Sequence, residues 1–146
     1  MVFAQRYGFE AIYSIELDRA LYQQAVERFR GFPRIEILQG DSGDVLPVLL
    51  AQFDRNCLFW LDGHYSGGET ARGESETPVM KELVAILAHP LQHVILIDDA
   101  RLFTGHEGYP SVADLREWVA RRRPEYTMTV EGDVIRLVGT EIESEK

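Results

Sequence analysis

Two short apolar segments, each ending abruptly at aspartate, constrain the fold of this chain more than any other feature. Residues 57–61 read Cys-Leu-Phe-Trp-Leu and stop at Asp62, and residues 93–97 read His-Val-Ile-Leu-Ile and stop at Asp98-Asp99. Unbroken apolar runs of this length are typical of strands that helices cover on both faces, as in a parallel sheet. We therefore expect two buried strands of such a sheet.

The rest of the chain alternates between strand and helix patterns. Further strands are predicted at residues 11–17 and 35–38, and the helices follow Asp18, cover residues 45–53, begin near Pro78, and run from a Ser111 cap to residue 123. Residues 126–130 and 134–138 predict a terminal hairpin. This order indicates right-handed βαβ units, hence an α/β fold with a mostly parallel sheet, to which the hairpin adds an antiparallel edge.

Length and composition describe an ordinary globular protein. The chain has 146 residues, of which 45% are hydrophobic and 27% are charged, and this size suits one domain. We place that domain at residues 1–140 and expect the acidic tail, residues 141–146, to be flexible. Cys57 is the only cysteine, which excludes an internal disulfide. We interpret Cys57 as a buried strand residue, and Trp60 and Trp118 as core.

Charge and hydropathy narrow the class of partner. The net charge of −9 argues against binding to nucleic acid or to anionic membranes, because both require clustered cations. The longest apolar runs fall far short of the roughly 20 residues that cross a bilayer, and the first ten residues lack a secretory signal pattern. We expect a cytoplasmic protein that acts on a small molecule.

The candidate functional residues follow the predicted strands. In an open parallel sheet, ligands bind beyond the carboxyl ends of the strands, so the polar residues found there are the first candidates for a site. Four strands end in this way, at Glu16 with Asp18, at Gly40-Asp41-Ser42, at Asp62-Gly63-His64 and at Asp98-Asp99.

Four motifs together carry a resemblance to a known family: Ser14-Ile-Glu-Leu-Asp18, Gly40-Asp41, Leu61-Asp-Gly-His64 and Ile97-Asp-Asp99. In order and spacing, over nearly the whole chain, they resemble class I S-adenosylmethionine-dependent methyltransferases. The resemblance implies a Rossmann-like fold, S-adenosylmethionine as cofactor and methyl transfer to a small-molecule acceptor.

The same resemblance assigns the cofactor residues. Glu16 matches the acidic residue that binds both ribose hydroxyls, a role that suits a carboxylate because it accepts two hydrogen bonds at once. Asp41 matches the acidic residue near the adenine, with Ser42 beside it. The alternative for Asp41 is a turn aspartate that caps the next helix.

Asp62, Asp98 and Asp99 are similar to the carboxylates of the metal-dependent branch, typified by catechol and caffeoyl-coenzyme A O-methyltransferases. There these positions hold a divalent ion, and oxygen ligands suit Mg²⁺, Ca²⁺ or Mn²⁺. This chain has Asp-Asp where that branch has Asp-Asn. A clustered set of carboxylates needs a cation or a proton between its members, so metal-assisted O-methylation is one expectation.

Two further residues near these carboxylates are candidates for specific roles. His64 is a candidate general base that removes a proton from the acceptor, since its ordinary pKa lies near neutrality; the alternative is a hydrogen-bonded loop residue. Arg101 is predicted to pair with one of the aspartates at positions 98 and 99, with an anionic group of the substrate as the alternative partner. The Arg121–Arg123 cluster is interpreted as a solvated helix C-terminus.

The resemblance also has a gap. Class I methyltransferases open with a strand and a glycine-rich turn beside the cofactor, and no Gly-x-Gly precedes Glu16, so the first strand and the turn are expected to be missing from an N-terminally incomplete domain. An unpaired edge and exposed apolar surface would follow, which predicts a homodimer or a larger assembly. The alternative functions are a non-catalytic or degenerate methyltransferase-like assembly module and, less well supported, a metal-dependent phosphate-ester hydrolase.

Overall fold

The structure is a computed structural model that describes residues 8–62 and 78–140. Contacts divide the chain into two compact units, Met1–Leu49 and Leu50–Lys146. The predicted acidic tail, residues 141–146, lies outside the described residues. The single domain expected over residues 1–140 stays a prediction.

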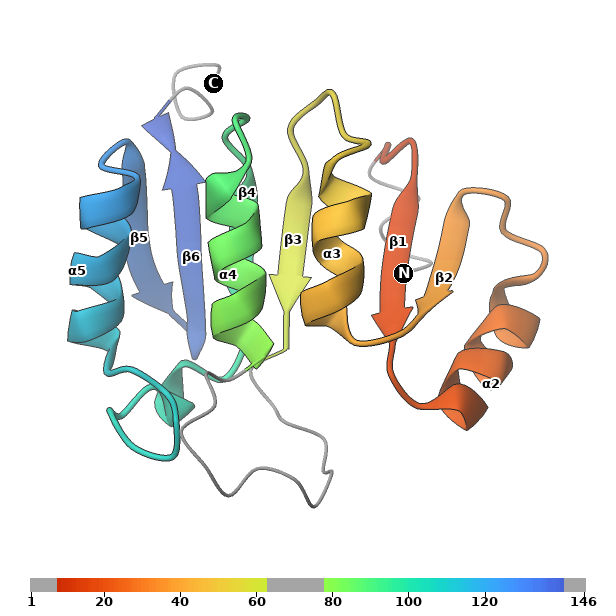
Figure 1. The fold of residues 1–146 in the computed structure, drawn as a ribbon, viewed down its shortest axis with the longest axis horizontal. Coiled ribbons are helices and arrows are strands. Elements are labelled where there is room, and N and C mark those ends of the chain that lie inside the picture. Colours follow the sequence, from red (N-terminus) through yellow and green to blue (C-terminus); the bar gives the residue numbers. More distant parts are fainter. Residues whose placement is uncertain (1–7, 63–77, 141–146) are drawn as a thin grey trace. The chain divides into compact units, whose positions relative to one another are not determined.

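From residue 8 onward, the first unit is a parallel strand pair with two helices, in the order β1 (Ile12–Glu16), α2 (Arg19–Phe29), β2 (Ile35–Gln39) and α3 (Ser42–Leu50), whose last residue falls in the second unit. β1 and β2 run in parallel, so their carboxyl ends share one edge of the pair (Figure 1). Asp18 starts α2 as predicted, because its Oδ1 accepts the backbone N–H groups of Ala20 and Leu21 at 2.8 and 2.9 Å.

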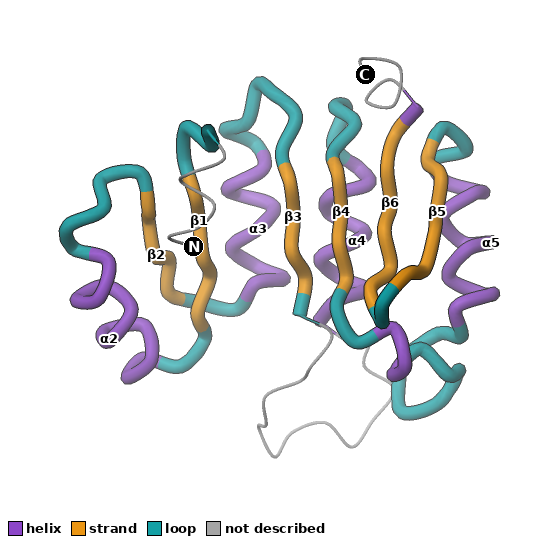
Figure 2. The backbone as a smooth tube through the Cα atoms, turned by 180° about the vertical axis from the view of Figure 1, so that it is seen from behind, coloured by secondary structure: helices purple, strands orange, loops and turns teal. Residues whose placement is uncertain are grey.

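The second unit is a four-stranded mixed sheet with two long helices. Its elements are β3 (Leu58–Leu61), α4 (Pro78–Ala88), β4 (Val94–Ile97), the short 3₁₀ helix η1 (Ala100–Leu102), α5 (Val112–Arg122), β5 (Tyr126–Glu131) and β6 (Val134–Gly139). The strand order is β3-β4-β6-β5, with β3 parallel to β4 and the hairpin antiparallel. Both α4 and α5 lie on the same face of this sheet, which Figures 1 and 2 show from opposite sides.

The core of the second unit lies between that face and the two helices. Side chains that alternate along β4 and β6 point into it and meet the apolar stripes of α4 and α5. The fully buried residues include Leu83, Ile86, Ile95, Ile97, Leu115, Ile135 and Leu137. None of the described helices combines the length and the hydrophobicity needed to span a membrane.

Several local predictions are confirmed and others are wrong. The α/β class, the parallel strand pairs, the Ser111 cap of α5 and the terminal hairpin are all observed. Trp60, predicted in the core, is 59% exposed, because it points away from the face that the helices cover. Trp118 is half-buried, with the Arg122 guanidinium 4.1 Å from its ring centroid. Cys57 is half-buried and precedes β3 rather than lying within it.

Helix α3 begins three residues before the predicted start. The carbonyl of Asp41 accepts the backbone N–H of Val45 at 2.9 Å, and the Asp41 Oδ1 accepts that of Gly43 at 2.8 Å. Asp41 therefore satisfies the first free amides of the helix, so the helix starts at Ser42.

Candidate functional site

Glu16 ends β1 and keeps acceptor capacity for a ligand. Its Oε1 accepts the backbone N–H of Asp18 at 3.0 Å, and its carbonyl accepts the N–H of Gly40 at 3.1 Å. These two bonds fix the residue at the shared edge of β1 and β2. Among the described residues, Oε2 has no hydrogen-bond partner, and each carboxylate oxygen can accept two bonds. Glu16 can therefore accept from two adjacent hydroxyl groups.

The turn after β2 combines a required glycine with a capping aspartate. A Cβ at Gly40, whose φ is 148°, would lie 2.8 Å from Cγ2 of Val45, so a larger residue does not fit. The helix-capping role that was the alternative for Asp41 is observed. Asp41 is exposed and its Oδ2 has no partner in the described part of the chain, so capping leaves room for the predicted cofactor role, which stays a prediction. Ser42 is the first residue of α3.

In the second unit, Asp62 and Asp98 follow neighbouring parallel strands. Leu61 pairs with Ile97, and the N–H of Asp98 donates to the carbonyl of Leu61 at 2.9 Å. The two aspartates therefore occupy adjacent strand ends, as the sequence predicted. Asp62 is exposed and Asp98 is half-buried.

Asp99 is buried and has a positive partner within the chain. Its side chain is 9% exposed, and its Oδ1 lies 2.5 Å from Nη1 of Arg101, which confirms the predicted ion pair. The same guanidinium also contacts Asp133. The bonds that Arg101 donates lower the pKa of the Asp133 carboxyl. Arg101 thus supplies the positive charge that the Asp99 carboxylate needs.

The predicted metal centre is not assembled in the described part of the chain. No group of three or more His, Cys, Asp or Glu side chains among residues 8–62 and 78–140 is arranged to hold a metal ion. Asp62 and Asp98 are brought together, whereas Asp99 turns to Arg101. The metal site at these three aspartates therefore stays a prediction. The candidate base His64 lies outside the described residues.

A contact residue of Arg101 that the sequence did not reveal is Asp133. It stands in the β5–β6 turn, where Gly132 and Asp133 have φ values of 57° and 65°, as a two-residue hairpin turn of type I′ requires. The Gly132-Asp133 pair in the sequence predicts the hairpin turn. It does not predict the contact of Asp133 with Arg101, because 32 residues separate these two residues.

A second polar cluster lies at the opposite ends of β3 and β4. His93 is fully buried; its Nδ1 accepts the N–H of Cys57 at 3.1 Å, and its Nε2 lies 2.9 Å from Nδ1 of His89. Burial, followed by the proximity of His89 and Arg123, lowers the pKa of His93 to about 4. This cluster joins the end of α4 to the segments that precede β3 and β4.

Arg123 corrects the interpretation of the arginine cluster. Its Nη1 donates to the carbonyls of Leu87 and His89 at 2.7 and 2.8 Å, so it caps the C-terminus of α4 from the end of α5. Arg121 is exposed and pairs with Glu117, as expected for a solvated helix terminus.

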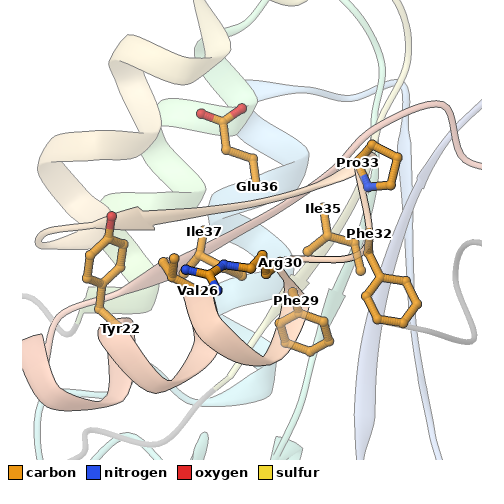
Figure 3. A pocket seen from close by; sticks show the side chains of 9 residues that line it. All are labelled: Tyr22, Val26, Phe29, Arg30, Phe32, Pro33, Ile35, Glu36 and Ile37. Atoms are coloured by element: carbon orange, nitrogen blue, oxygen red, sulfur yellow. The ribbon is translucent and has the colours of Figure 1, made fainter.

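A groove in the first unit lies away from the carboxyl ends of β1 and β2. It has a volume of about 310 Å³ between α2 and β2 (Figure 3). Its lining residues are Tyr22, Val26, Phe29, Arg30, Phe32, Pro33, Ile35, Glu36 and Ile37. Neither Glu16 nor Asp41 is among them, so the groove is separate from the candidate site.

Comparisons with known proteins concern the fold. No protein-family model matches the sequence, and no curated protein matches it significantly. A solved structure from Staphylococcus aureus, named as a caffeoyl-CoA O-methyltransferase, is similar with a TM-score of 0.53 at 15% identity, over 88% of this chain and 65% of that one. The Escherichia coli protein yhhF, named as a methyltransferase, is similar with a TM-score of 0.48 at 13% identity, over 88% of this chain and 63% of that one.

The chain thus spans slightly less than two thirds of both proteins. The likeness to the Staphylococcus aureus structure confirms the predicted fold class, a Rossmann-like α/β fold. At this identity the likeness concerns the fold.

Proposed function

We propose that this chain binds S-adenosylmethionine and takes part in methyl transfer to a small-molecule acceptor in the cytoplasm. The observation that carries the proposal is the Glu16 carboxylate, fixed at the end of β1 by Asp18 with one oxygen left open. The fold supports the proposal because ligands of open α/β sheets bind at this end of the strands. When bound, the cofactor supplies a methyl group activated by its sulfonium.

The residues of the first unit account for cofactor binding in this proposal. Glu16 accepts the two ribose hydroxyls, and the absence of a side chain at Gly40 lets the following turn pack closely against Val45. The open oxygen of Asp41 accepts from the exocyclic amine of the adenine, and the Ser42 hydroxyl is available beside it. The helix-capping bond of Asp41 holds its carboxylate in place for that role.

The residues of the second unit account for the acceptor side. Asp62 and Asp98 present carboxylates at adjacent strand ends, where they can accept hydrogen bonds from acceptor hydroxyl or amine groups. His64, two residues after Asp62, is the proposed base that takes the acceptor proton. A His64→Gln chain with full turnover would end that assignment. Metal assistance through Asp62, Asp98 and Asp99 stays a prediction.

Calorimetric titration of S-adenosylhomocysteine into the chain tests the proposal. We expect micromolar affinity, and a loss of about tenfold or more in Glu16→Gln, since a neutral amide replaces charge-assisted acceptors. Glu36→Gln is the matched control, because Glu36 is an exposed acid on the neighbouring strand β2 and lies away from the strand end. Its affinity should equal that of the unchanged protein.

Absence of binding would favour the other function, a methyltransferase-like assembly module. The observation that supports assembly is the exposed apolar edge of the second sheet, where Leu58 and Trp60 of β3 are 44% and 59% exposed. Large apolar side chains on an edge strand are typical of interaction surfaces. We propose self-association as a homodimer through this edge, whichever function holds.

A further inference from the structure

The chain leaves β4 through a residue in a strained conformation. Asp99, directly after Asp98, has φ 58° and ψ 47°, in the left-handed region. Residues other than glycine are uncommon there, although aspartate and asparagine adopt it more readily than most. Such conformations persist only where the surroundings hold them, and they gather at functional sites.

The peptide bond between Asp98 and Asp99 connects the left-handed turn to the Asp98 carboxylate. Its N–H, on the residue that adopts the left-handed conformation, donates to Oδ1 of Asp98 at 2.9 Å. In the described part of the chain, Oδ2 of Asp98 has no hydrogen-bond partner. One oxygen therefore accepts the Asp99 amide, and the other is available at the end of β4, next to the strand end that carries Asp62.

The hairpin turn between β5 and β6 holds this conformation from outside. The carbonyl of Asp133 accepts the N–H of Ala100 at 2.8 Å, and its Oδ1 accepts the N–H of Arg101 at 2.8 Å. Its Oδ2 contacts the Arg101 guanidinium, which also reaches Asp99. The pairing of Ile97 with Ile135 places the hairpin turn next to the end of β4.

We propose that Asp133 is a positioning residue: through Arg101 it holds the left-handed turn at Asp99 and so orients the Asp98 carboxylate toward the hydroxyl or amine group of the acceptor. The inference rests on the proposed function, which places Asp98 on the acceptor side. It adds the terminal hairpin to the site, although the hairpin is distant in the sequence from the ends of β3 and β4.

The variant Asp133→Asn isolates the charge. Asparagine tolerates the positive φ and keeps an acceptor for the Arg101 N–H, but it removes the ion pair with the guanidinium. Arg101→Met removes the same link from the other side and leaves the hairpin sequence intact. Glu131→Gln is the matched control, because Glu131 lies in the same hairpin and pairs with Arg136 rather than with η1.

Amide hydrogen exchange and the side-chain ¹³C signal of Asp98, both followed by nuclear magnetic resonance, test the inference without any ligand. In Asp133→Asn and Arg101→Met we expect exchange at the Asp99 amide to accelerate about tenfold and the Asp98 carboxyl signal to shift. The Ile95 and Ile97 amides should keep their protection, and Glu131→Gln should change neither signal. An Asp99 amide and an Asp98 signal that stay unchanged in both folded variants would overturn the inference.

The cofactor titration separates this inference from the proposed function. Asp133→Asn should bind S-adenosylhomocysteine as the unchanged chain does, because the cofactor residues lie in the first unit. If the unchanged chain fails to bind S-adenosylhomocysteine, the proposed function fails, whereas the exchange experiment still decides whether Asp133 positions Asp98.

Discussion

Nε2 of His93 lies 2.9 Å from Nδ1 of His89, and the two rings stack with their centroids 4.9 Å apart. Because Nδ1 of His93 accepts the N–H of Cys57, the proton of this neutral ring is on Nε2, which donates to His89. Both nitrogens of His93 are thus engaged in the neutral form. A second proton on Nδ1 would break the bond to Cys57.

This arrangement predicts an acid-sensitive fold. The pKa of His93 falls from its ordinary 6.5 to about 4 in the folded chain, so the unfolded chain binds this proton more readily. The stability that neutral His93 contributes is fully present above pH 6.5 and is lost as the pH falls toward 4. The free energy of unfolding falls by at most about 3 kcal/mol through this residue. Urea unfolding at intervals from pH 7.5 to 4 measures the loss.

Two variants make the acid prediction specific. His93→Phe keeps the edge-to-face ring contact with Phe59 and removes the titrating group, so its stability should fall less over this pH range. His106→Gln, a change at an exposed histidine, should follow the unchanged chain. Parallel pH curves for His93→Phe and the unchanged chain would contradict the assignment.

Arg123 is predicted to be the arginine of its cluster that matters for stability. Its side chain is 16% exposed and donates to two carbonyls at the end of α4, which would lose their partners in Arg123→Met. We expect a loss of about 2 kcal/mol in the free energy of unfolding. Arg121→Met, which removes only an exposed pair with Glu117, should cost less than about 0.5 kcal/mol. Equal losses in the two variants would show that Arg123 is no cap.

The close contact between Gly139 and Gln92 gives a packing prediction. A Cβ at Gly139 would lie 2.8 Å from Cβ of the buried Gln92 and closer still to its Oε1, so Gly139→Ala must displace that side chain. We expect a loss of about 1 to 3 kcal/mol in denaturant unfolding. Gly31→Ala is the control, because a Cβ there meets nothing within 4 Å. A neutral Gly139→Ala would mean that Gln92 moves freely.

The features that sequence reasoning predicted correctly are those set by neighbouring residues. Asp18 and Ser111 cap the helices that they precede, since a side-chain oxygen needs only the next two or three amides. The Gly132-Asp133 turn joins its strands because both residues accept a positive φ. Glu16 was assigned from the resemblance, and its place at a strand end is observed.

The features that were missed depend on contacts between distant segments. Trp60 is exposed because the helices cover the other face of the sheet. An unbroken apolar run in the sequence does not indicate which face will be covered. Arg123 caps a helix that ends 35 residues earlier, and Asp133 reaches η1 from the hairpin.

The exposed edge of the second sheet predicts a dimer that one substitution disrupts. Trp60 and Leu58 lie on β3, the terminal strand of the order β3-β4-β6-β5, and both are largely exposed. Burying such side chains between two copies gains roughly 25 cal/mol for each Å² of apolar surface, whereas a carboxylate at this position would be desolvated without a partner. We expect light scattering to give a dimer mass for the unchanged chain at micromolar concentration and a monomer mass for Trp60→Glu.

Val130→Glu is the matched control, since Val130 is 43% exposed on β5, at the opposite edge of the same sheet. A monomeric unchanged chain, or a Trp60→Glu chain that still dimerises, would exclude the β3 edge as the contact.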